Sequence, residues 1–500
     1  MRHSFLVITL VVMVGLLTGC AATQQTSKAT PICVHPDNPH YFLFRHQPAI
    51  LITSAEHYGT VVNLDFDYVA YLDVLVSRGM DYTRIYPGAY FETDGYFISD
   101  NVLGPRNSRH SLPWARSSVP GYPLGGNKFD LDSWDNTYFE RLKDFITKAG
   151  NRGIVVEICF FNGMYPDLWA KLPLYHGNNI QGVGTCDYKD VQTLKDKALV
   201  ARQQAYVRKI TQEVNRFDNV ILEICDEPGI KGTPADEYTP WVRHMVDVIV
   251  KTEKKLPNKH LIAQQVCGTL GGAGDFSADS RVQVITGQYV WMASAGQQFG
   301  GMQLLDCVYE QNKPIELNET NYYPLGYKGD KIAASRVEAW EFIVGGGAGF
   351  NQLNSLYSTY NPTAAGTENN MLLRGLENLK HFMYSFDFIK MSRDTSFVAS
   401  GVPAGAFARG ISQPPNQYAL YIHHSILSKG VEYIVQPGTY QENLVLHIGA
   451  GNYRSDWVEP ATGNIICTDT FSHSGGNRAF TTPQYSVDIA LRIKKLSPRQ

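Results

Sequence analysis

The chain has 500 residues, of which 44% are apolar and 18% charged, and its formal net charge is −3. These values are typical of a globular protein, and the length favours a large domain together with a smaller one. The charge gives no basic surface for nucleic acid, and no apolar stretch beyond the N-terminus is long enough to cross a membrane.

The N-terminus carries a predicted export signal. Arg2 supplies a positive charge, and residues 5–17 form an apolar segment of the length found in signal peptides. Leu17-Thr18-Gly19-Cys20 then resembles a bacterial lipobox, which implies cleavage before Cys20 and attachment of lipid to it. The alternative is an ordinary cleaved signal with an incidental cysteine.

Three predictions follow for this region. Residues 1–20 are the signal peptide, and the polar residues 21–34 are a flexible tether. Because Ala21 rather than an aspartate follows Cys20, the resemblance to bacterial sorting signals implies a lipid anchor in the outer membrane of a Gram-negative bacterium.

From about residue 48 to 355, short apolar strands alternate with helical patterns. Strands are expected at 49–53, 81–86, 153–158, 219–225, 260–263 and 282–286, in a segment that ends at Glu319, and at 348–353. This alternation favours a (β/α)8 barrel over a doubly wound sheet. No G-x-G-x-x-G motif follows a strand and no C-x-x-C occurs, so neither an organic cofactor nor a metal is predicted.

Two further regions depart from this alternation. An insertion after the second strand, at 88–135, is rich in proline and glycine and is expected to lack regular structure. After about residue 395, short alternating strands separated by turns predict an antiparallel β-sandwich. We therefore expect a catalytic barrel at 35–392 and a C-terminal β-sandwich at 393–500.

Two of the predicted barrel strands end in carboxylates. The fourth ends in Asp226-Glu227-Pro228, and the seventh is Lys313-Pro314-Ile315-Glu316-Leu317-Asn318-Glu319. Because active sites of parallel α/β folds lie at the carboxyl ends of strands, Glu227 and Glu319 should meet there. Two such acids can cleave a glycosidic bond, since one protonates the leaving oxygen while the other attacks or activates water.

Strand alternation gives an expectation for the other acids on these strands. Glu319 should share a face with Leu317, and Glu316 should then point toward the surrounding helices. Glu223 is expected to be structural.

Residues near the same rim have two interpretations each. His57 follows the first strand and either hydrogen-bonds a sugar or is a satisfied loop histidine. Three aromatic residues either stack against sugar rings or pack in the core: Trp169, Trp291 and Tyr357.

The two acid motifs resemble those of clan A glycoside hydrolases, especially cellulase-like family 5 enzymes. Those enzymes carry Asn-Glu-Pro at the end of strand four and Lys-Pro-x-x-x-x-Glu on strand seven. The resemblance implies retaining hydrolysis of a β-linked oligo- or polysaccharide, with Glu227 as acid/base and Glu319 as nucleophile. It also implies that Arg84 lies near the nucleophile and that Tyr289 bonds to it. The C-terminal tail looks like the sandwich appended to some bacterial barrel glycosidases.

One residue departs from the family pattern. Asp226 stands where those enzymes have the asparagine that bonds the sugar 2-hydroxyl. A carboxylate accepts but does not donate a hydrogen bond, and its charge would raise the pKa of Glu227. This departure favours the alternative hypothesis, a non-catalytic glycan-binding lipoprotein on the same barrel. An esterase is disfavoured because no G-x-S-x-G motif is present.

Overall fold

The structure is a computed structural model. It describes residues 30–55, 59–268, 270–287, 290–292, 297–299, 301–320, 323–324, 326–428 and 432–497. Three residues singled out by the sequence lie outside these ranges: Cys20, His57 and Tyr289. The predictions made for them therefore stay predictions.

A parallel sheet of eight strands forms the centre of the described structure, in the order β4-β15-β14-β11-β10-β9-β8-β5. The bounds are β4 Leu51–Ala55, β5 Tyr82–Ile85, β8 Val155–Asn162, β9 Val220–Asp226, β10 Leu261–Gln265, β11 Val284–Gly287, β14 Ile315–Leu317 and β15 Gly349–Leu353. At the seam between β4 and β5, Asp81 N donates to Ile52 O at 3.4 Å and the Asp81 carboxylate accepts from Ile52 N at 3.0 Å. The predicted (β/α)8 barrel is confirmed.

The strands are buried on both faces, which explains why they read as apolar runs. Every residue of β8 and of β9 is buried, since one face lines the barrel interior and the other packs on helices. Polar side chains in such strands must therefore form hydrogen bonds or ion pairs within the barrel, and several of them belong to the candidate site.

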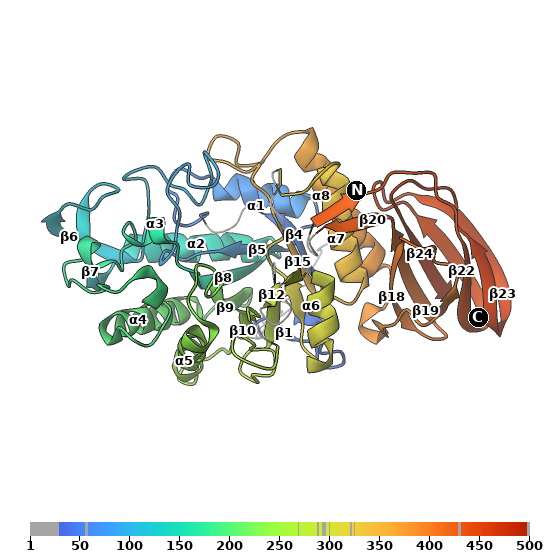
Figure 1. The fold of residues 1–500 in the computed structure, drawn as a ribbon, viewed down its shortest axis with the longest axis horizontal. Helices are drawn as coiled ribbons and strands as arrows, with labels where there is room; N and C mark the ends of the chain where they lie inside the picture. The colour runs from blue at the N-terminus through green and yellow to red at the C-terminus, as the bar shows by residue number, and fades with distance from the viewer. Residues whose placement is uncertain are drawn as a thin grey trace, which may run out of the picture.

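Helices cover the outside of the barrel (Figure 1). The described helices are α1 Tyr68–Ser77, α2 Asn136–Asn151, α3 Pro166–Trp169, α4 Lys197–Val214, α5 Ala235–Glu253, α6 Gly301–Val308, α7 Lys331–Val344 and α8 Thr367–Tyr384. Four of them begin after an aspartate whose side chain accepts a first-turn amide: Asp67, Asp135, Asp196 and Asp330. Within the described ranges, no helix combines the length and apolar character needed to span a membrane.

A small antiparallel sheet closes the amino end of the barrel. It comprises β1 Cys33–Val34, β2 Phe42–Phe44 and β3 Gln47–Ala49, and β3 leads directly into β4. Ile32 N donates to Asp218 O at 2.8 Å, and Arg45 binds the Asp218 carboxylate at 2.7 and 2.9 Å. Because residue 218 precedes β9, this sheet covers the end opposite the expected site.

The insertion between β5 and α2 is more regular than its composition indicates. It contains the antiparallel hairpin of β6, Trp114–Pro120, and β7, Asn127–Trp134, which lies at one extreme of the molecule (Figure 1). The expectation of no regular structure was therefore wrong. Irregularities of register between the two strands hid the alternation that normally marks a hairpin. A second short pair comprises β12, Val290–Met292, and β13, Gln297–Phe299.

The C-terminal domain is antiparallel, as predicted. Its strands are β16 Ser392–Arg393, β17 Val398–Ser400, β18 Phe407–Gln413, β19 Gln417–His423, β20 Ser425–Ser428, β21 Glu432–Val435, β22 Asn443–Val458, β23 Ile465–Thr481 and β24 Asp488–Lys495. The β22–β23 pair bends sharply near Gly475 and Gly476, whose φ angles are 95° and 97°. The bend brings Phe471 within 5.7 Å of Phe480, so that both halves of the pair enclose one core.

Helix α7 lies between the barrel and the C-terminal domain (Figure 1). Trp340 stacks on Tyr421 of β19 at 5.5 Å, and Arg336 binds Asp488 of β24 at 3.0 and 2.9 Å. Most residues of this helix are buried, because it packs on the barrel on one side and the sheet on the other. The two domains therefore share one helix as a common layer.

Buried charge also crosses this junction. Glu341 of α7 accepts a hydrogen bond from Tyr433 at 2.5 Å and pairs with Arg409 at 3.0 Å and with His423 at 3.3 Å. Burial alone would raise the pKa of Glu341, but these partners hold it at about 2. The junction therefore contains a carboxylate whose charge is stabilised by the folded structure.

Candidate active site

Two acids, Asp226 and Glu227, lie where strand β9 ends, at the carboxyl end of the barrel. Asp226 is the last residue of β9, and Glu227 follows with a φ of 43°. Residues other than glycine seldom adopt this left-handed conformation, and its strain is often found at functional sites. The Glu227 amide is held by a hydrogen bond to the Gln265 side chain at the end of β10. The turn is therefore fixed by the neighbouring strand.

The Glu227 carboxyl group is suited to proton donation. The Tyr165 hydroxyl, just before α3, donates to Glu227 Oε2 at 3.1 Å. Burial and the nearby charge of Asp226 raise the pKa of Glu227 to about 7, although Tyr165, Lys231 and Arg84 act in the opposite direction. A carboxyl group of this kind keeps its proton near neutral pH, as a general acid requires.

Arg84 connects the ends of three strands. Its fully buried guanidinium binds Glu223 Oε2 through Nε at 2.7 Å, lies 3.2 Å from Asp226 Oδ1 and lies 3.3 Å from Glu319 Oε2. Burial opposes its charged form, but Asp226 and Glu223 hold its pKa well above the ordinary value. The structure thus places three of the sequence-predicted residues together: Arg84, Asp226 and Glu319.

Glu319 lies two residues beyond the end of β14. Its side chain is 12% exposed, so a ligand at the rim can contact it. Burial raises the pKa of Glu319 to about 8, while the Arg84 guanidinium favours its carboxylate form. An acid that is partly exposed and paired with an arginine can act as a nucleophile once it is ionised.

Asp226 is turned inward and is held by other protein groups. The Tyr86 hydroxyl donates to Asp226 Oδ2 at 2.8 Å, and Asn162 in turn donates to the Tyr86 oxygen at 2.7 Å. Its other oxygen faces Arg84. Since only 1% of Asp226 is exposed, its main effect is a fixed negative charge beside Glu227.

Below this layer the barrel interior contains further acids. Asn318 donates to Glu157 at 3.2 Å and to Glu223 at 3.1 Å, and Tyr82 also hydrogen-bonds Glu157. Burial raises the pKa of Glu157 well above its usual range, and the Glu223 charge adds to the effect. Glu223 thus supports Arg84 and Asn318, in line with the structural role expected for it.

The expected orientation of Glu316 was wrong. Glu316 pairs in register with Thr286, whose hydroxyl donates to Glu223 in the barrel interior at 3.4 Å, so Glu316 also points into the barrel rather than toward the helices. Burial and the charge of Glu223 raise the pKa of Glu316 to about 8. Leu317 instead packs toward Gly301 of α6. The expectation failed because it extended strand alternation from Glu319, which lies past the end of β14 where alternation no longer holds.

Two of the three aromatic candidates pack in the protein interior. Trp169 is 4% exposed and its indole donates to Cys186 O at 3.0 Å, while Tyr357 is completely buried. Neither can stack on a sugar in this conformation. The side chain of Trp291 lies outside the described structure, as do His57 and Tyr289.

Two residues beside Glu227 were missed by the sequence reasoning. Tyr165 follows the third strand at the same rim, and that position was the signal that could have identified it. Glu92 comes from the insertion, and burial raises its pKa to about 8, with the Glu227 charge adding to the effect. Only the fold brings Glu92 near the site, so the sequence held no comparable signal.

The described residues contain no group of three or more His, Cys, Asp or Glu side chains placed to hold a metal ion. No protein-family model matches the chain, and no curated protein matches its sequence.

Solved structures resemble the whole described architecture. A structure described as a glycoside hydrolase matches with a TM-score of 0.60 at 14% identity, covering 94% of this chain and 98% of its own. A putative glycoside hydrolase from Bacteroides vulgatus matches with a TM-score of 0.60 at 12% identity, covering 93% of this chain and 82% of its own. A family 5 glycoside hydrolase from the same organism gives 0.58 at 12% identity, covering 93% of both chains.

The chain has the fold of family 5-like glycoside hydrolases. The coverage of at least 93% of this chain means that each match extends past the barrel into the C-terminal domain. The two-domain architecture is therefore shared with these structures, and not the barrel alone.

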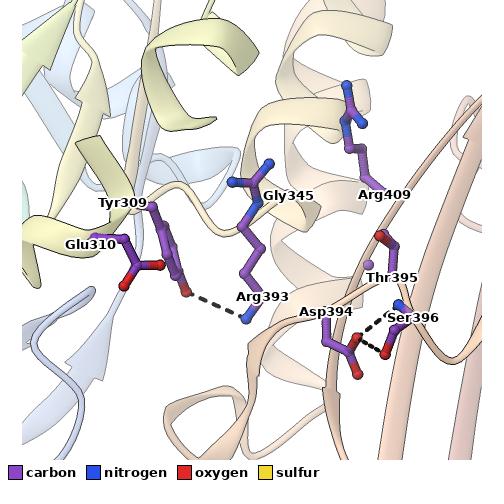
Figure 2. A pocket seen from close by; sticks show the side chains of 9 residues that line it. Tyr309, Glu310, Gly345, Arg393, Asp394, Thr395, Ser396 and Arg409 are labelled. Atoms are coloured by element: carbon purple, nitrogen blue, oxygen red, sulfur yellow. Dashed lines mark hydrogen bonds between the residues drawn. The ribbon is translucent and has the colours of Figure 1, made fainter. Parts of the chain in front are cut away.

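A cavity of about 400 Å³ lies at the domain junction (Figure 2). The Arg393 amide donates to the Tyr309 hydroxyl at 3.4 Å, and Asp394 accepts from the amide and hydroxyl of Ser396 at 2.8 and 2.6 Å. Tyr309 and Gly345 precede β14 and β15, so this cavity lies toward the amino end of the barrel. It is therefore separate from the carboxylates of this glycoside hydrolase fold.

Proposed function

We propose that this protein is a retaining glycoside hydrolase that cleaves a β-linked oligo- or polysaccharide. The observation that carries the proposal is the Arg84 link between Glu319 and the Asp226-Glu227 turn at the carboxyl ends of β14 and β9. It supports the assignment of Glu319 as nucleophile and Glu227 as acid/base.

Hydrolysis then proceeds in two displacements. The Glu319 carboxylate attacks the anomeric carbon while Glu227 gives its proton to the leaving oxygen, so the glycosidic C–O bond breaks and a glycosyl ester forms. Glu227, now ionised, removes a proton from water, which attacks the anomeric carbon and releases Glu319. A pKa of about 7 suits Glu227 to both roles near neutral pH.

Substitution of the two acids tests the proposal. Wild-type protein, Glu319→Gln and Glu227→Gln are assayed on a panel of β-linked tetrasaccharides with product sizing. We expect each variant to lose about 1000-fold or more in kcat/KM. Glu310→Gln is a matched control, because Glu310 is exposed and lies before β14, at the opposite end of that strand from Glu319. Unchanged hydrolysis by Glu319→Gln would eliminate the assignment.

A non-catalytic glycan-binding protein is the second candidate, favoured by Asp226. The Asp226 carboxylate already binds Tyr86 and Arg84, so it is a poor hydrogen-bond acceptor for a sugar hydroxyl. This candidate predicts that wild-type protein binds an oligosaccharide of the panel in calorimetry while product sizing detects no cleavage. Our proposal predicts cleavage of the oligosaccharides that bind.

We also propose that Cys20 carries lipid and anchors the enzyme in the outer membrane. The proposal rests on the lipobox-like sequence after the apolar segment. In a Gram-negative host, the wild-type protein should fractionate with outer membranes, and Cys20→Ala should move to the soluble fraction. Equal fractionation of both proteins would contradict it.

A further inference from the structure

Two aromatic side chains from the insertion lie against Tyr165, the hydrogen-bond partner of Glu227. The Phe97 and Tyr96 rings lie 5.7 and 6.2 Å from the Tyr165 ring, and 4.6 Å from one another. The Tyr165 hydroxyl at the far end of that ring donates to Glu227. One tyrosine therefore separates the Phe97 ring from the proposed acid.

Phe97 is exposed in a way that the other aromatic residues near the site are not. Its side chain is 53% exposed, whereas Tyr90, Phe91 and Trp169 are almost completely buried. An exposed aromatic ring held by neighbouring rings offers a flat apolar surface without the entropy cost of ordering it. Such a surface suits the C–H face of a pyranose.

A polar group lies beside the rings. The Tyr90 hydroxyl donates to Glu92 Oε1 at 3.2 Å, and the Tyr90 ring lies 6.5 Å from that of Tyr165. Burial raises the pKa of Glu92 to about 8, with the Glu227 charge adding to it, so near neutral pH Glu92 is a neutral acid. Such a group can both donate to and accept from a sugar hydroxyl.

The proposed function determines which sugar would lie there. The acid must contact the oxygen of the leaving group, so the leaving-group sugar lies on the Glu227 side of the cleaved bond. We infer that Tyr96, Phe97 and Glu92 form the binding site for this leaving-group sugar, a neutral pyranose that stacks on Phe97 and hydrogen-bonds Glu92. This inference rests on the proposed function and assigns a role to the insertion.

Two kinds of substrate distinguish a loss of binding at the leaving-group sugar from a loss of the bond-cleaving activity itself. The β-linked tetrasaccharide that the wild-type protein cleaves fastest fills the site, whereas the glycosyl fluoride of the same non-reducing sugar has no leaving-group sugar. We expect Phe97→Ala to lower kcat/KM on the tetrasaccharide about 10-fold or more and to leave the fluoride within about 2-fold. Val119→Ala is the control, because Val119 is exposed on β6 of the same insertion.

Glu92 is tested by a pair of variants on the same substrates. Glu92→Ala should lower kcat/KM on the tetrasaccharide, mainly through KM, while Glu92→Gln should retain most of it because an amide also donates and accepts. Both should hydrolyse the fluoride like the wild-type protein.

The outcomes distinguish this inference from the proposed function. Equal losses on tetrasaccharide and fluoride in Phe97→Ala would show a structural role and overturn the binding site alone. No loss on the tetrasaccharide would also overturn it. A wild-type protein that hydrolyses neither substrate would overturn the proposed function and with it this inference.

Discussion

The Arg84 guanidinium of β5 lies 3.2 Å from the Asp226 carboxylate of β9, across the intervening strand β8, and both side chains are buried. The pair has two effects on the proposed catalytic acids. Asp226 takes up part of the Arg84 charge that would otherwise act on Glu319, and it places a negative charge beside Glu227. Both effects raise the pKa of a carboxyl group that the mechanism uses.

Asp226→Asn should therefore move the pH profile of kcat/KM to lower pH. Removal of the anion lowers the pKa of Glu227, so the acid loses its proton at lower pH. It also leaves more of the Arg84 charge for Glu319, which then ionises at lower pH. We expect both limbs of the kcat/KM profile to shift by about one pH unit toward lower pH.

The control for this variant is Asp236→Asn, an exposed aspartate on α5, which should leave the profile unchanged. A shift of the Asp226→Asn profile toward higher pH would contradict the electrostatic role given to Asp226.

On the proposed mechanism, the wild-type protein should have a bell-shaped pH profile of kcat/KM with its maximum between about pH 7 and 8. Burial raises the pKa of Glu227 to about 7 and that of Glu319 to about 8. The active form has its single proton on Glu227 and Glu319 ionised; it is the less populated of the two singly protonated forms, and its population is greatest between the two pKa values. At lower pH both groups are protonated and Glu319 cannot attack; at higher pH both are ionised and Glu227 cannot donate. Measurement of kcat/KM from pH 4 to 10 checks this, and a maximum below pH 6 would argue against it.

Glu227→Ala should reveal the stereochemistry of the reaction. With an activated aryl β-glycoside, Glu319 still forms the glycosyl ester, but no base activates water, so the ester accumulates. Added azide needs no base and should increase turnover about 10-fold or more, giving a β-glycosyl azide identified by NMR. An α-azide product would indicate inversion, and the carboxyl groups would then lie farther apart than the roughly 5–5.5 Å expected for retention.

Glu341→Gln should weaken the domain junction in a pH-dependent way. The folded pKa of about 2 lies below the ordinary value of 4.5, so the ionised group stabilises the fold above about pH 4.5 and this stability is lost as the pH falls toward 2. The shift corresponds to about 3 kcal/mol at pH 7.

Urea unfolding of the wild-type protein and of Glu341→Gln measures the difference in their free energies of unfolding, which should be smaller at pH 3 than at pH 7. The control is Glu140→Gln, since Glu140 is exposed on α2. A difference in free energy of unfolding between wild type and Glu341→Gln that is larger at pH 3 than at pH 7 would contradict a stabilising charge on Glu341.

The barrel could be predicted because its strands are buried on both faces and therefore read as continuous apolar runs. Position at the end of such a run also identified Glu227 and Glu319 as candidates, whereas Arg84 was implied by the resemblance of the acid motifs to those of family 5 enzymes. The orientation of Glu316 could not be predicted by counting alternation from Glu319, because the strand ends between them. The contacts of Glu92 and Phe97 depend on how an irregular insertion folds over the rim, which local pattern does not encode.

The small sheet at the amino end of the barrel determines how an anchored enzyme would face its surroundings. The described chain starts at residue 30, on the side where Ile32 meets Asp218, and the proposed catalytic acids lie at the other end of the strands. The ten residues from Cys20 to that point span at most about 35 Å when extended. A lipid on Cys20 would thus hold the closed end toward the membrane and leave the two proposed catalytic acids at the end that faces away from it.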